Sequence, residues 1–308
     1  MIWLYVLLGV FGFLFILFLA TLIFVYVLTF YTPFRIQNDD FRLTEATQFV
    51  GQEKFVYELI VSLKKRQCNH IYTTSFDKKE LHARFYPNEK SNKYVIMFHG
   101  YRGTAYRDFS GGASHMIDSG YNVILVDERG HGESQGHSIT FGNREKKDVL
   151  TWIDYAKKVH GNDIEIILVG ISMGAATVLF AAQYIPGSIK IICDCPYSTP
   201  KEIICETLKK LNLPVKIFYP LLNFVLLLFA HSSLNKDDAS ESVKKSNHKV
   251  LIIHGNKDTV VPHRFSYRIY QENKEKVRYE LFPNTDHGVS YLTDTKRYLS
   301  LIDDFLKD

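Results

Sequence analysis

Residues 167–180, ILVGISMGAATVLF, change character at their middle. The first residues are large and apolar, as in a buried strand, and the last are small residues that favour a helix. Ser172 lies between the two halves, with Gly170 and Gly174 two positions away on either side. Strand, Gly-x-Ser-x-Gly and helix together are typical of a nucleophile elbow, a tight turn that exposes the serine hydroxyl. We therefore predict that Ser172 is a nucleophile.

Apolar runs alternate with helical patterns along most of the chain. Strands are predicted at residues 71–75, 81–86, 94–98, 121–126, 164–169, 189–193, 249–253 and 277–282. Helices are predicted at residues 108–119, 144–159, 173–183, 263–273 and 293–306. This alternation predicts an α/β fold with a mostly parallel central sheet flanked by helices on both faces. Sites in such folds lie beyond the carboxyl ends of the strands.

The N-terminal residues 1–34 contain no charged side chain. Crossing a bilayer takes roughly 20 apolar residues, and the apolar run at 2–30 is longer than that. Aromatic residues lie near both ends of the run, as in membrane interfaces: Trp3, Tyr5, Tyr26 and Tyr31. A cleaved signal peptide is the alternative, but the run lacks a basic start and a small-residue cleavage site and is too long. We predict an uncleaved transmembrane anchor over residues 1–34.

Basic residues follow the predicted anchor and none precede it. They include Arg35, Arg42, Lys54, Lys64, Lys65 and Arg66. The positive-inside rule therefore predicts a catalytic domain on the cytoplasmic side of the cell membrane. Residues 35–70 are predicted to link the anchor to the domain, with an amphipathic helix at 44–65. The domain itself is predicted at 71–308.

An insertion of about residues 197–248 interrupts the alternation of strands and helices. Its centre, residues 213–230, is nearly as apolar as the anchor, but it is short and contains Pro214 and Pro220. These features favour a helical cap over a second membrane span. The cap either packs on the sheet or has a more specific role, lining an acyl-chain pocket or contacting lipid. In the pocket role, polar substitutions at 226–228 would impair cleavage of long acyl chains most.

A serine nucleophile needs a base, and the base needs an acid that fixes its tautomer. His287 is the last histidine and follows the last predicted strand, so we predict it as the base. His254, at a strand end, is expected to pack or bond locally. Asp258 lies in the loop after the buried strand 249–253 and is the predicted acid, while Asp194, at the end of the preceding strand, is the alternative.

The oxyanion of an acyl-transfer intermediate requires two N–H donors. The backbone N–H of Met173, the residue after the predicted nucleophile, supplies one of them. The other is expected from the loop after the strand 94–98, where the sequence reads FHGYRG. Tyr101 N–H is the predicted second donor.

Several motifs together resemble the α/β-hydrolase superfamily: HGYRG (99–103), DERGHGES (127–134), GISMGA (170–175), HGNKD (254–258) and DHG (286–288). The resemblance covers about residues 71–308. With its apolar N-terminal segment and short cap, the chain is similar to bacterial membrane-anchored serine hydrolases of esterase or lipase type, such as staphylococcal fluorophosphonate-binding hydrolases. In that superfamily the DERGHGES segment shapes a loop, so the resemblance implies that Asp127 and His131 are supporting residues.

The resemblance implies hydrolysis through an acyl-enzyme on Ser172, His287 and Asp258, with no metal or cofactor. A carboxylic ester, lipid-like or acyl, is the expected small-molecule substrate, because the anchor and the apolar cap hold the domain near lipid. The alternatives are a serine peptidase of aminopeptidase or oligopeptidase type, acyl transfer or thioester cleavage, and a fold kept as a non-catalytic scaffold. The net charge of +4 argues against a nucleic-acid partner. The four cysteines have no spacing of a metal or disulfide framework.

Overall fold

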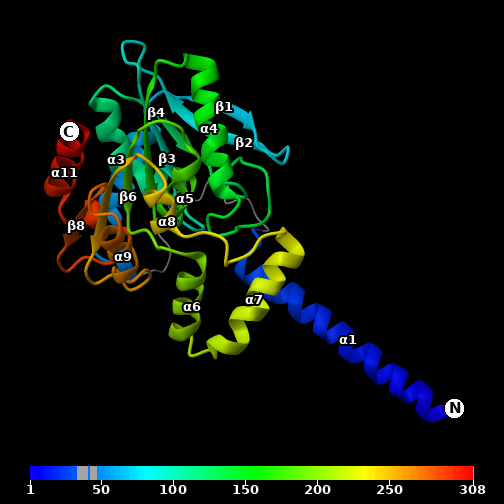
Figure 1. Cartoon of the computed structure of the whole chain (residues 1–308). Helices are drawn as coiled ribbons and strands as arrows, with labels where there is room; N and C mark the ends of the chain where they lie inside the picture. The colour runs from blue at the N-terminus through cyan, green and yellow to red at the C-terminus, as the bar shows by residue number, and fades with distance from the viewer. Residues whose placement is uncertain (33–40, 42–46, 308) are drawn as a thin grey trace.

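The computed structural model describes residues 1–32, 41 and 47–307. An eight-stranded sheet in the order β1-β2-β4-β3-β5-β6-β7-β8 forms the centre of the molecule (Figure 1). β1 and β2 are antiparallel to their neighbours, and the six strands β3 to β8 are parallel to one another. The predicted α/β fold is confirmed. It is the sheet of the α/β-hydrolase fold, with its parallel strands feeding loops to one edge.

The strands are β1 (Asn69–Thr74), β2 (Glu80–Tyr86), β3 (Lys93–Phe98), β4 (Asn122–Val126), β5 (Glu165–Ile171), β6 (Lys190–Asp194), β7 (Lys249–Gly255) and β8 (Val277–Phe282). The α-helices are α1 (Ile2–Thr29), α2 (Glu53–Lys64), α3 (Ala105–Asp118), α4 (Glu145–His160), α5 (Met173–Ala181), α6 (Pro200–Lys210), α7 (Val215–Ala230), α8 (Ala239–Lys244), α9 (Arg264–Glu272), α10 (Ser290–Thr293) and α11 (Thr295–Lys307). Two 3₁₀ turns, η1 (Thr47–Phe49) and η2 (Ala182–Tyr184), complete the described elements.

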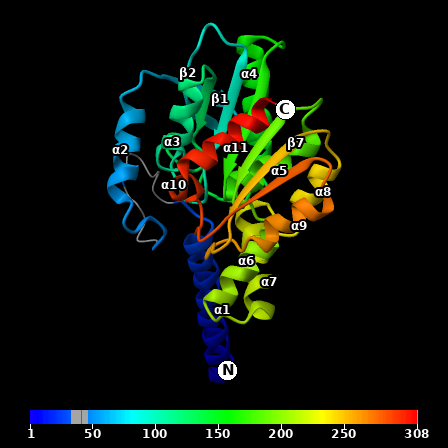
Figure 2. The same cartoon turned by 90° about the vertical axis from the view of Figure 1, so that its left-hand side faces the viewer.

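Helices cover both faces of the sheet, as Figure 2 shows. One core contains α4, α5, α7 and α8, with Trp152 and Phe180 fully buried. The other contains α2, α3 and α11 and buries residues such as Ile60 and Met116. Because the inner parallel strands are covered on both sides, β3 to β7 are apolar at consecutive positions after their first residue, whereas the edge strand β8 contains Arg278 and Glu280.

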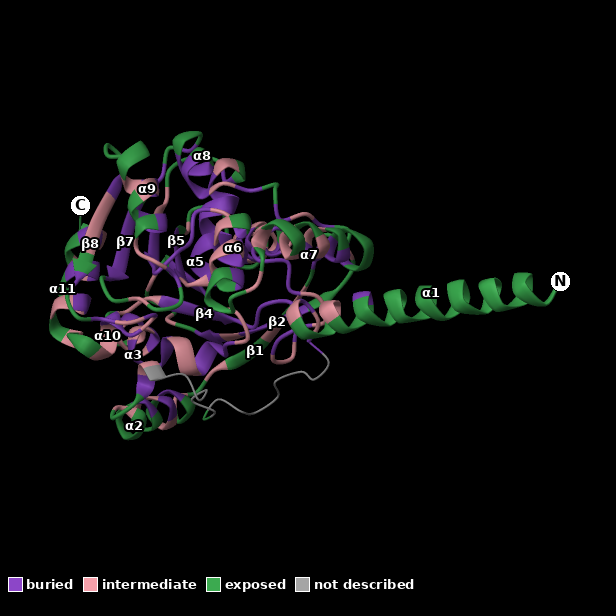
Figure 3. Ribbon diagram, turned by 90° about the horizontal axis from the view of Figure 1, so that it is seen from below, coloured by how far each residue is buried: buried purple, intermediate pink, exposed green. Residues whose placement is uncertain are grey.

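Helix α1 projects from the domain, and its 28 residues extend about 42 Å (Figure 3). Every residue from Ile2 to Thr21 is exposed, and Leu22 is the first that the domain buries. Farther on, Phe30 is fully buried and Tyr31 pairs with Ser138. By length and composition α1 is a candidate membrane span, a test that an N-terminal signal sequence also passes.

The insertion between β6 and β7 forms α6, α7 and α8. Helix α7 lies beside the base of α1 (Figure 1), where the rings of Tyr26 and Phe229 stack with centroids 4.8 Å apart. Pro220 lies within α7. Leu226 is buried in the core, while the neighbouring Leu227 and Leu228 are about half exposed.

The linking segment differs from the single helix predicted at 44–65. Residues 42–46, with Arg42, lie outside the described residues, as do 33–40, with Arg35. Residues 47–49 form η1, and α2 begins only at Glu53. Gly51, with a φ of +83°, lies in the turn between them. This left-handed conformation favours glycine and ends the helical path, so the prediction of one continuous helix is wrong.

Candidate active site

The loops after β3, β5, β7 and β8 meet at the carboxyl edge of the sheet. Ser172 lies between β5 and α5 with φ of 53° and ψ of −114°, a backbone conformation that is strained for a residue with a side chain. A Cβ atom on Gly170 would stand 2.5 Å from Ala175 N, and one on Gly174 would overlap the carbonyl oxygen of Phe98. Both glycines are therefore needed where the helix begins so close to two strands. The strand–turn–helix context predicted from the sequence is present.

Ser172, His287 and Asp258 form a chain of hydrogen bonds. Ser172 Oγ lies 2.9 Å from His287 Nε2, and His287 Nδ1 lies 2.7 Å from Asp258 Oδ2. The carboxylate accepts the proton on Nδ1, which leaves the Nε2 lone pair for the serine hydroxyl. This is the geometry in which a histidine can take the proton of a serine nucleophile.

The surroundings of Asp258 keep it ionised and aimed at the ring. Its Oδ1 accepts the backbone N–H groups of Val260 and Val261 at 2.8 and 2.7 Å, which leaves Oδ2 for His287. Burial alone would raise the pKa of Asp258, but the charges and hydrogen bonds of His287 and His254 outweigh it and lower the pKa well below its usual value. For His287, burial lowers the pKa, but the charge and hydrogen bond of Asp258 outweigh burial. The pKa of His287 therefore lies above its ordinary value.

His254 bonds locally, as the sequence indicated, but it also approaches the acid. Its Nε2 lies 2.8 Å from the carbonyl oxygen of Val261 and 3.1 Å from Asp258 Oδ2. On the other side of the ring, Nδ1 lies 2.7 Å from Ser266 Oγ. The ring is fully buried and fixed at both nitrogens. His254 therefore holds the loop that carries the carboxylate.

The alternative acid, Asp194, is buried at the end of β6 and has other partners. Ser290 Oγ donates to its Oδ1 at 3.3 Å, and Tyr298 also hydrogen-bonds it. Burial raises the pKa of Asp194 to about 6. Among the described carboxylates, Asp258 is the one that hydrogen-bonds the His287 ring. The carboxylate of Asp286 accepts the backbone N–H of His287 at 2.7 Å.

The loop after β3, where an oxyanion donor is predicted, lies against the serine. A Cβ on Gly100 would stand 3.4 Å from Ser172 Cβ. Gly100 N–H donates to Asp108 Oδ2 at 2.8 Å, and Arg102 N–H donates to His131 Nε2 at 3.2 Å. The amides on either side of Tyr101 are thus held by side chains, which fixes the loop around the predicted donor.

Two buried histidines fasten this loop to the segment after β4. Burial lowers the pKa of His131 to about 3, so the ring is neutral; Nδ1–H donates to the carbonyl oxygen of Arg129 at 3.0 Å, and Nε2 accepts from Arg102. His99 Nε2 accepts the backbone N–H of Glu128 at 3.0 Å. His131 is therefore a supporting residue, as the resemblance implied.

The end of α1 reaches the same loop, a contact that sequence reasoning missed. The Arg102 guanidinium donates to the carbonyl oxygens of Leu28 at 3.0 Å and Tyr31 at 3.3 Å. The last carbonyls of a helix have no partner within it, so a cation that binds them stabilises the helix end. The candidate anchor and the predicted oxyanion loop are directly joined.

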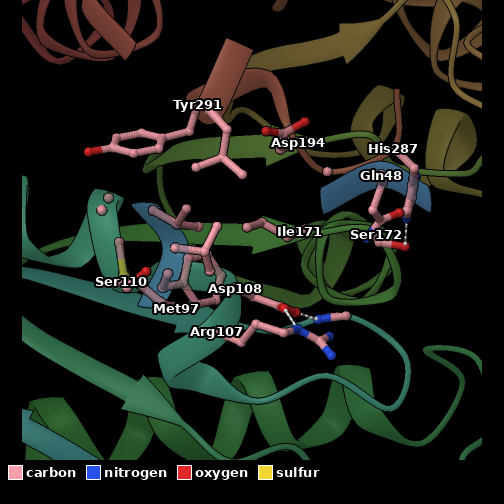
Figure 4. A pocket seen from close by; sticks show the side chains of 18 of the residues that line it. Gln48, Met97, Arg107, Asp108, Ser110, Ile171, Ser172, Asp194, His287 and Tyr291 are labelled. Atoms are coloured by element: carbon pink, nitrogen blue, oxygen red, sulfur yellow. Dashed lines mark hydrogen bonds and ion pairs between the residues drawn. The ribbon is translucent and has the colours of Figure 1, made fainter. Parts of the chain in front are cut away.

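A cavity of about 420 Å³, lined mostly by apolar side chains, adjoins Ser172 and His287 (Figure 4). Its walls come from η1, α2, α3, α10 and α11, and they include Phe49, Leu59, Met116, Tyr291 and Ile302. The cap does not line this cavity, since none of the described residues of α6 or α7 borders it. Of the alternative roles for the cap, lining this cavity is therefore not one that residues 226–228 fill. Leu226 packs into the core instead, and α2 supplies the wall.

Cys195 lies close to the hydrogen-bonded chain. Its Sγ is 4.0 Å from His287 Nε2, and its backbone has a φ of +47°. Burial raises the pKa of this thiol well above its usual value, so it stays protonated. A protonated thiol is a poor metal ligand, and the neighbouring carboxylate and imidazole already bind each other.

Comparisons with known proteins agree with this fold. Residues 89–233 match a family model described as serine aminopeptidase, S33. The uncharacterized protein YqkD of Bacillus subtilis is 28% identical over 194 residues, which cover 62% of this chain and 64% of that protein. The esterase Pf2001 of Pyrococcus furiosus superposes with a TM-score of 0.66 and 22% identity, over 80% of this chain and 92% of that one. An esterase of Exiguobacterium antarcticum gives a TM-score of 0.58 and 21% identity, over 78% of this chain and 100% of that one.

The sheet order, the turn that carries Ser172 and the family match all point the same way. We conclude that the chain has the α/β-hydrolase fold and that residues 89–233, a little under half of it, are similar to the serine aminopeptidase family.

Proposed function

We propose that this protein is a membrane-anchored serine hydrolase that cleaves carboxylic esters with lipid-like acyl chains. The observation that carries the proposal is the chain Ser172–His287–Asp258 beside an apolar cavity. Ser172 is the proposed nucleophile, His287 the base and Asp258 the acid. Tyr101 N–H and Met173 N–H are the proposed oxyanion donors.

In the proposed reaction, His287 Nε2 takes the hydroxyl proton as Ser172 Oγ attacks the ester carbonyl. The tetrahedral oxyanion is stabilised by the two backbone donors. When it collapses, the bond to the alcohol breaks and the imidazolium returns its proton to the leaving oxygen. Water, deprotonated by His287, then attacks the acyl-enzyme, and the carboxylic acid product is released from Ser172. Asp258 remains ionised throughout and stabilises the charged ring.

The cavity supports an acyl chain as the part of the substrate that is recognised. Each methylene removed from water stabilises a complex by about 0.8 kcal/mol, so an apolar cavity beside the nucleophile selects substrates by chain length. The acyl chain of the substrate would lie between α2, α3 and α11, in contact with Phe49, Leu59 and Ile302.

Helix α1 supports a bilayer location for the domain. The residues Ile2–Thr21, which the domain leaves exposed, extend about 30 Å, the thickness of the hydrocarbon core. Beside its base, α7 exposes large apolar side chains: Ile217, Phe224, Leu227, Leu228 and Phe229. We infer that this face of α7 contacts the same bilayer. The basic residues after the anchor favour the cytoplasmic side, which reactivity of a single engineered cysteine toward a membrane-impermeant maleimide in intact cells would test.

A peptidase is the second candidate, because the matching family model is described as a serine aminopeptidase. A substrate amine needs a free carboxylate near the nucleophile. Asp108 and Asp194 both line the cavity. Asp108, however, pairs with Arg107 and accepts Gly100 N–H, and Asp194 is bound by Ser290. These engaged carboxylates favour the ester.

The test is hydrolysis of p-nitrophenyl esters from acetate to palmitate beside a panel of aminoacyl p-nitroanilides. Wild type and Ser172→Ala are compared in the same detergent. Serine-dependent ester cleavage with a chain-length optimum supports the proposal. Serine-dependent cleavage of the anilides alone would favour the peptidase, and activity that survives in Ser172→Ala would refute the nucleophile. Adding an alcohol and analysing the products separates hydrolysis from acyl transfer.

A further inference from the structure

Three potential metal ligands converge at the β1–β2 edge of the sheet, outside the hydrogen-bonded chain described above. His70 comes from β1, His82 from β2, and Glu133 from the segment after β4. His70 Nδ1 lies 2.8 Å from His82 Nε2 and 3.5 Å from Glu133 Oε1. His82 Nε2 lies 3.8 Å from the same carboxylate oxygen.

The spacing of these three atoms suits one ion. A triangle with edges of 2.8, 3.5 and 3.8 Å has a point about 2.0 Å from all three corners. Zn²⁺ binds histidine nitrogen at about 2.0–2.1 Å and carboxylate oxygen at about 2.0–2.2 Å. An ion at that point would reach normal bond lengths without a change of backbone.

The groups behind the ligands orient them toward the same point. His82 is fully buried, and its Nδ1 lies 2.7 Å from the carboxylate of Asp127, whose other oxygen accepts from Arg84 at 2.8 Å. The Nδ1 proton is thereby held on the Asp127 side, and the Nε2 lone pair faces His70 and Glu133. A histidine ligand typically donates its second N–H to a carboxylate in this way.

The two carboxylate oxygens of Glu133 face different partners. Tyr72 donates its hydroxyl proton to Oε2 at 2.9 Å, which leaves Oε1 turned toward the two rings. Without an ion, a proton on His70 Nδ1 occupies the lone pair of His82 Nε2, but the two acceptors Nε2 and Oε1 still face each other at 3.8 Å with no proton between them. A cation between the three atoms compensates all of them.

We propose that His70, His82 and Glu133 bind a divalent transition-metal ion of the Zn²⁺ class. Two imidazoles and one carboxylate are a ligand set that zinc uses with water in the fourth position. The side chains of His70 and Glu133 are 50% and 40% exposed, so solvent reaches that position.

The ion would have a structural role and would take no part in ester cleavage. It would tie β1 and β2 to the segment after β4, and His131 in that segment holds Arg102 beside the predicted oxyanion donor. Loss of the ion is therefore expected to loosen the loop without altering the bonds among Ser172, His287 and Asp258.

The test measures zinc in the full-length, detergent-purified protein after loading with Zn²⁺ and desalting. The variants are His70→Ala and the isosteric Glu133→Gln. The matched control is His115→Ala, which removes a histidine on α3 that pairs with Asp303 instead. Circular dichroism and the melting temperature of each protein report whether it is folded.

One equivalent of zinc in wild type and in His115→Ala, and less than a tenth of that in both site variants, is the expected result. Replacing zinc by Co²⁺ should give visible absorption bands in wild type that are absent from Glu133→Gln. Wild type that retains no zinc, or folded site variants that retain as much as wild type, would overturn the proposal. Ester hydrolysis is not the readout, so the metal site and the proposed function can fail independently.

Discussion

The hydroxyl of Tyr101 donates a hydrogen bond to the carbonyl oxygen of Thr29 at 2.8 Å. Thr29 is the last residue of α1, and Tyr101 carries the N–H that we propose as an oxyanion donor. The Tyr101 ring also stacks on Phe141, with centroids 5.2 Å apart. The side chain of Tyr101 thus fixes to the end of the candidate anchor the loop that carries the proposed oxyanion donor.

Removing this hydroxyl should weaken catalysis without removing the nucleophile. Tyr101→Phe keeps the ring and the backbone donor but loses the bond to Thr29. One such hydrogen bond contributes about 1 kcal/mol, so kcat is expected to fall roughly five-fold. The measurement is kcat on a short p-nitrophenyl ester in detergent, with fluorophosphonate labelling as the control for folding. An unchanged kcat would show that the bond from Tyr101 to Thr29 does not position the loop.

Ser172→Ala should abolish covalent labelling by a fluorophosphonate. The alanine keeps the turn but lacks the oxygen that the probe phosphorylates. Circular dichroism and the melting temperature should stay close to those of wild type, because Gly170 and Gly174 are unchanged. Labelling of the variant at the rate of wild type would mean that another residue is the nucleophile.

Asp258→Asn should slow ester turnover roughly 10⁴-fold, as in other triads. The pH dependence of activity in Asp258→Asn is an independent test of the same assignment. His287 acts as a base when neutral, so activity rises with pH through its pKa, which Asp258 raises. Without that charge the pKa falls, and the rising limb of the profile should move to lower pH. Asp194→Asn is the matched variant, and a loss as large as that of Asp258→Asn would make Asp194 the acid.

Leu59→Trp should shorten the preferred acyl chain. Leu59 lines the cavity from α2, where it is only partly buried, so a larger side chain projects into the space at small cost to stability. Hydrolysis of the longest esters should fall at least ten-fold while that of acetate stays within about two-fold, since removing about two buried methylenes costs more than 1.4 kcal/mol. The ester series measures it. Equal losses at every chain length would place the acyl chain elsewhere.

The exposed face of α7 should enter lipid. A fluorescent NBD group on Leu228→Cys, with the native cysteines replaced by serine, is expected to emit at shorter wavelength in nanodiscs than in water. Spin-labelled lipids should quench it. The same group on Val159→Cys, which is exposed on α4 at the far side of the domain, is the control. Identical spectra at the two positions would rule out the bilayer contact.

Local patterns were sufficient to predict the turn at Ser172, because strand, glycines and helix follow one another within a few residues. The position of Asp258 after a buried strand favoured it as the acid, but local patterns left Asp194 as an alternative. Both follow parallel strands that end at the same edge, and only the packed structure shows Asp194 engaged by Ser290 and Asp258 within 2.7 Å of His287.

The walls of the cavity were also beyond the sequence. Val56, Ile60 and Leu63 lie on one face of α2, and their spacing predicts that this face is buried. The spacing does not show which other parts of the protein cover this face. The contact of Tyr101 with Thr29 joins residues 72 positions apart through a hydroxyl and a carbonyl oxygen, and neither group carries a sequence signature.

In the proposed membrane-anchored enzyme, α1 would leave the lipid near Leu22, the first of its residues that the domain buries. For a membrane hydrolase this sets a constant height of the reacting carbonyl above the bilayer. Substrate search then becomes two-dimensional: a lipid ester arrives by lateral diffusion, and the rate follows its mole fraction in the membrane. Diluting the substrate with inert lipid at constant bulk concentration would slow the enzyme proposed here, whereas a freely diffusing esterase that acts on soluble esters would be unaffected.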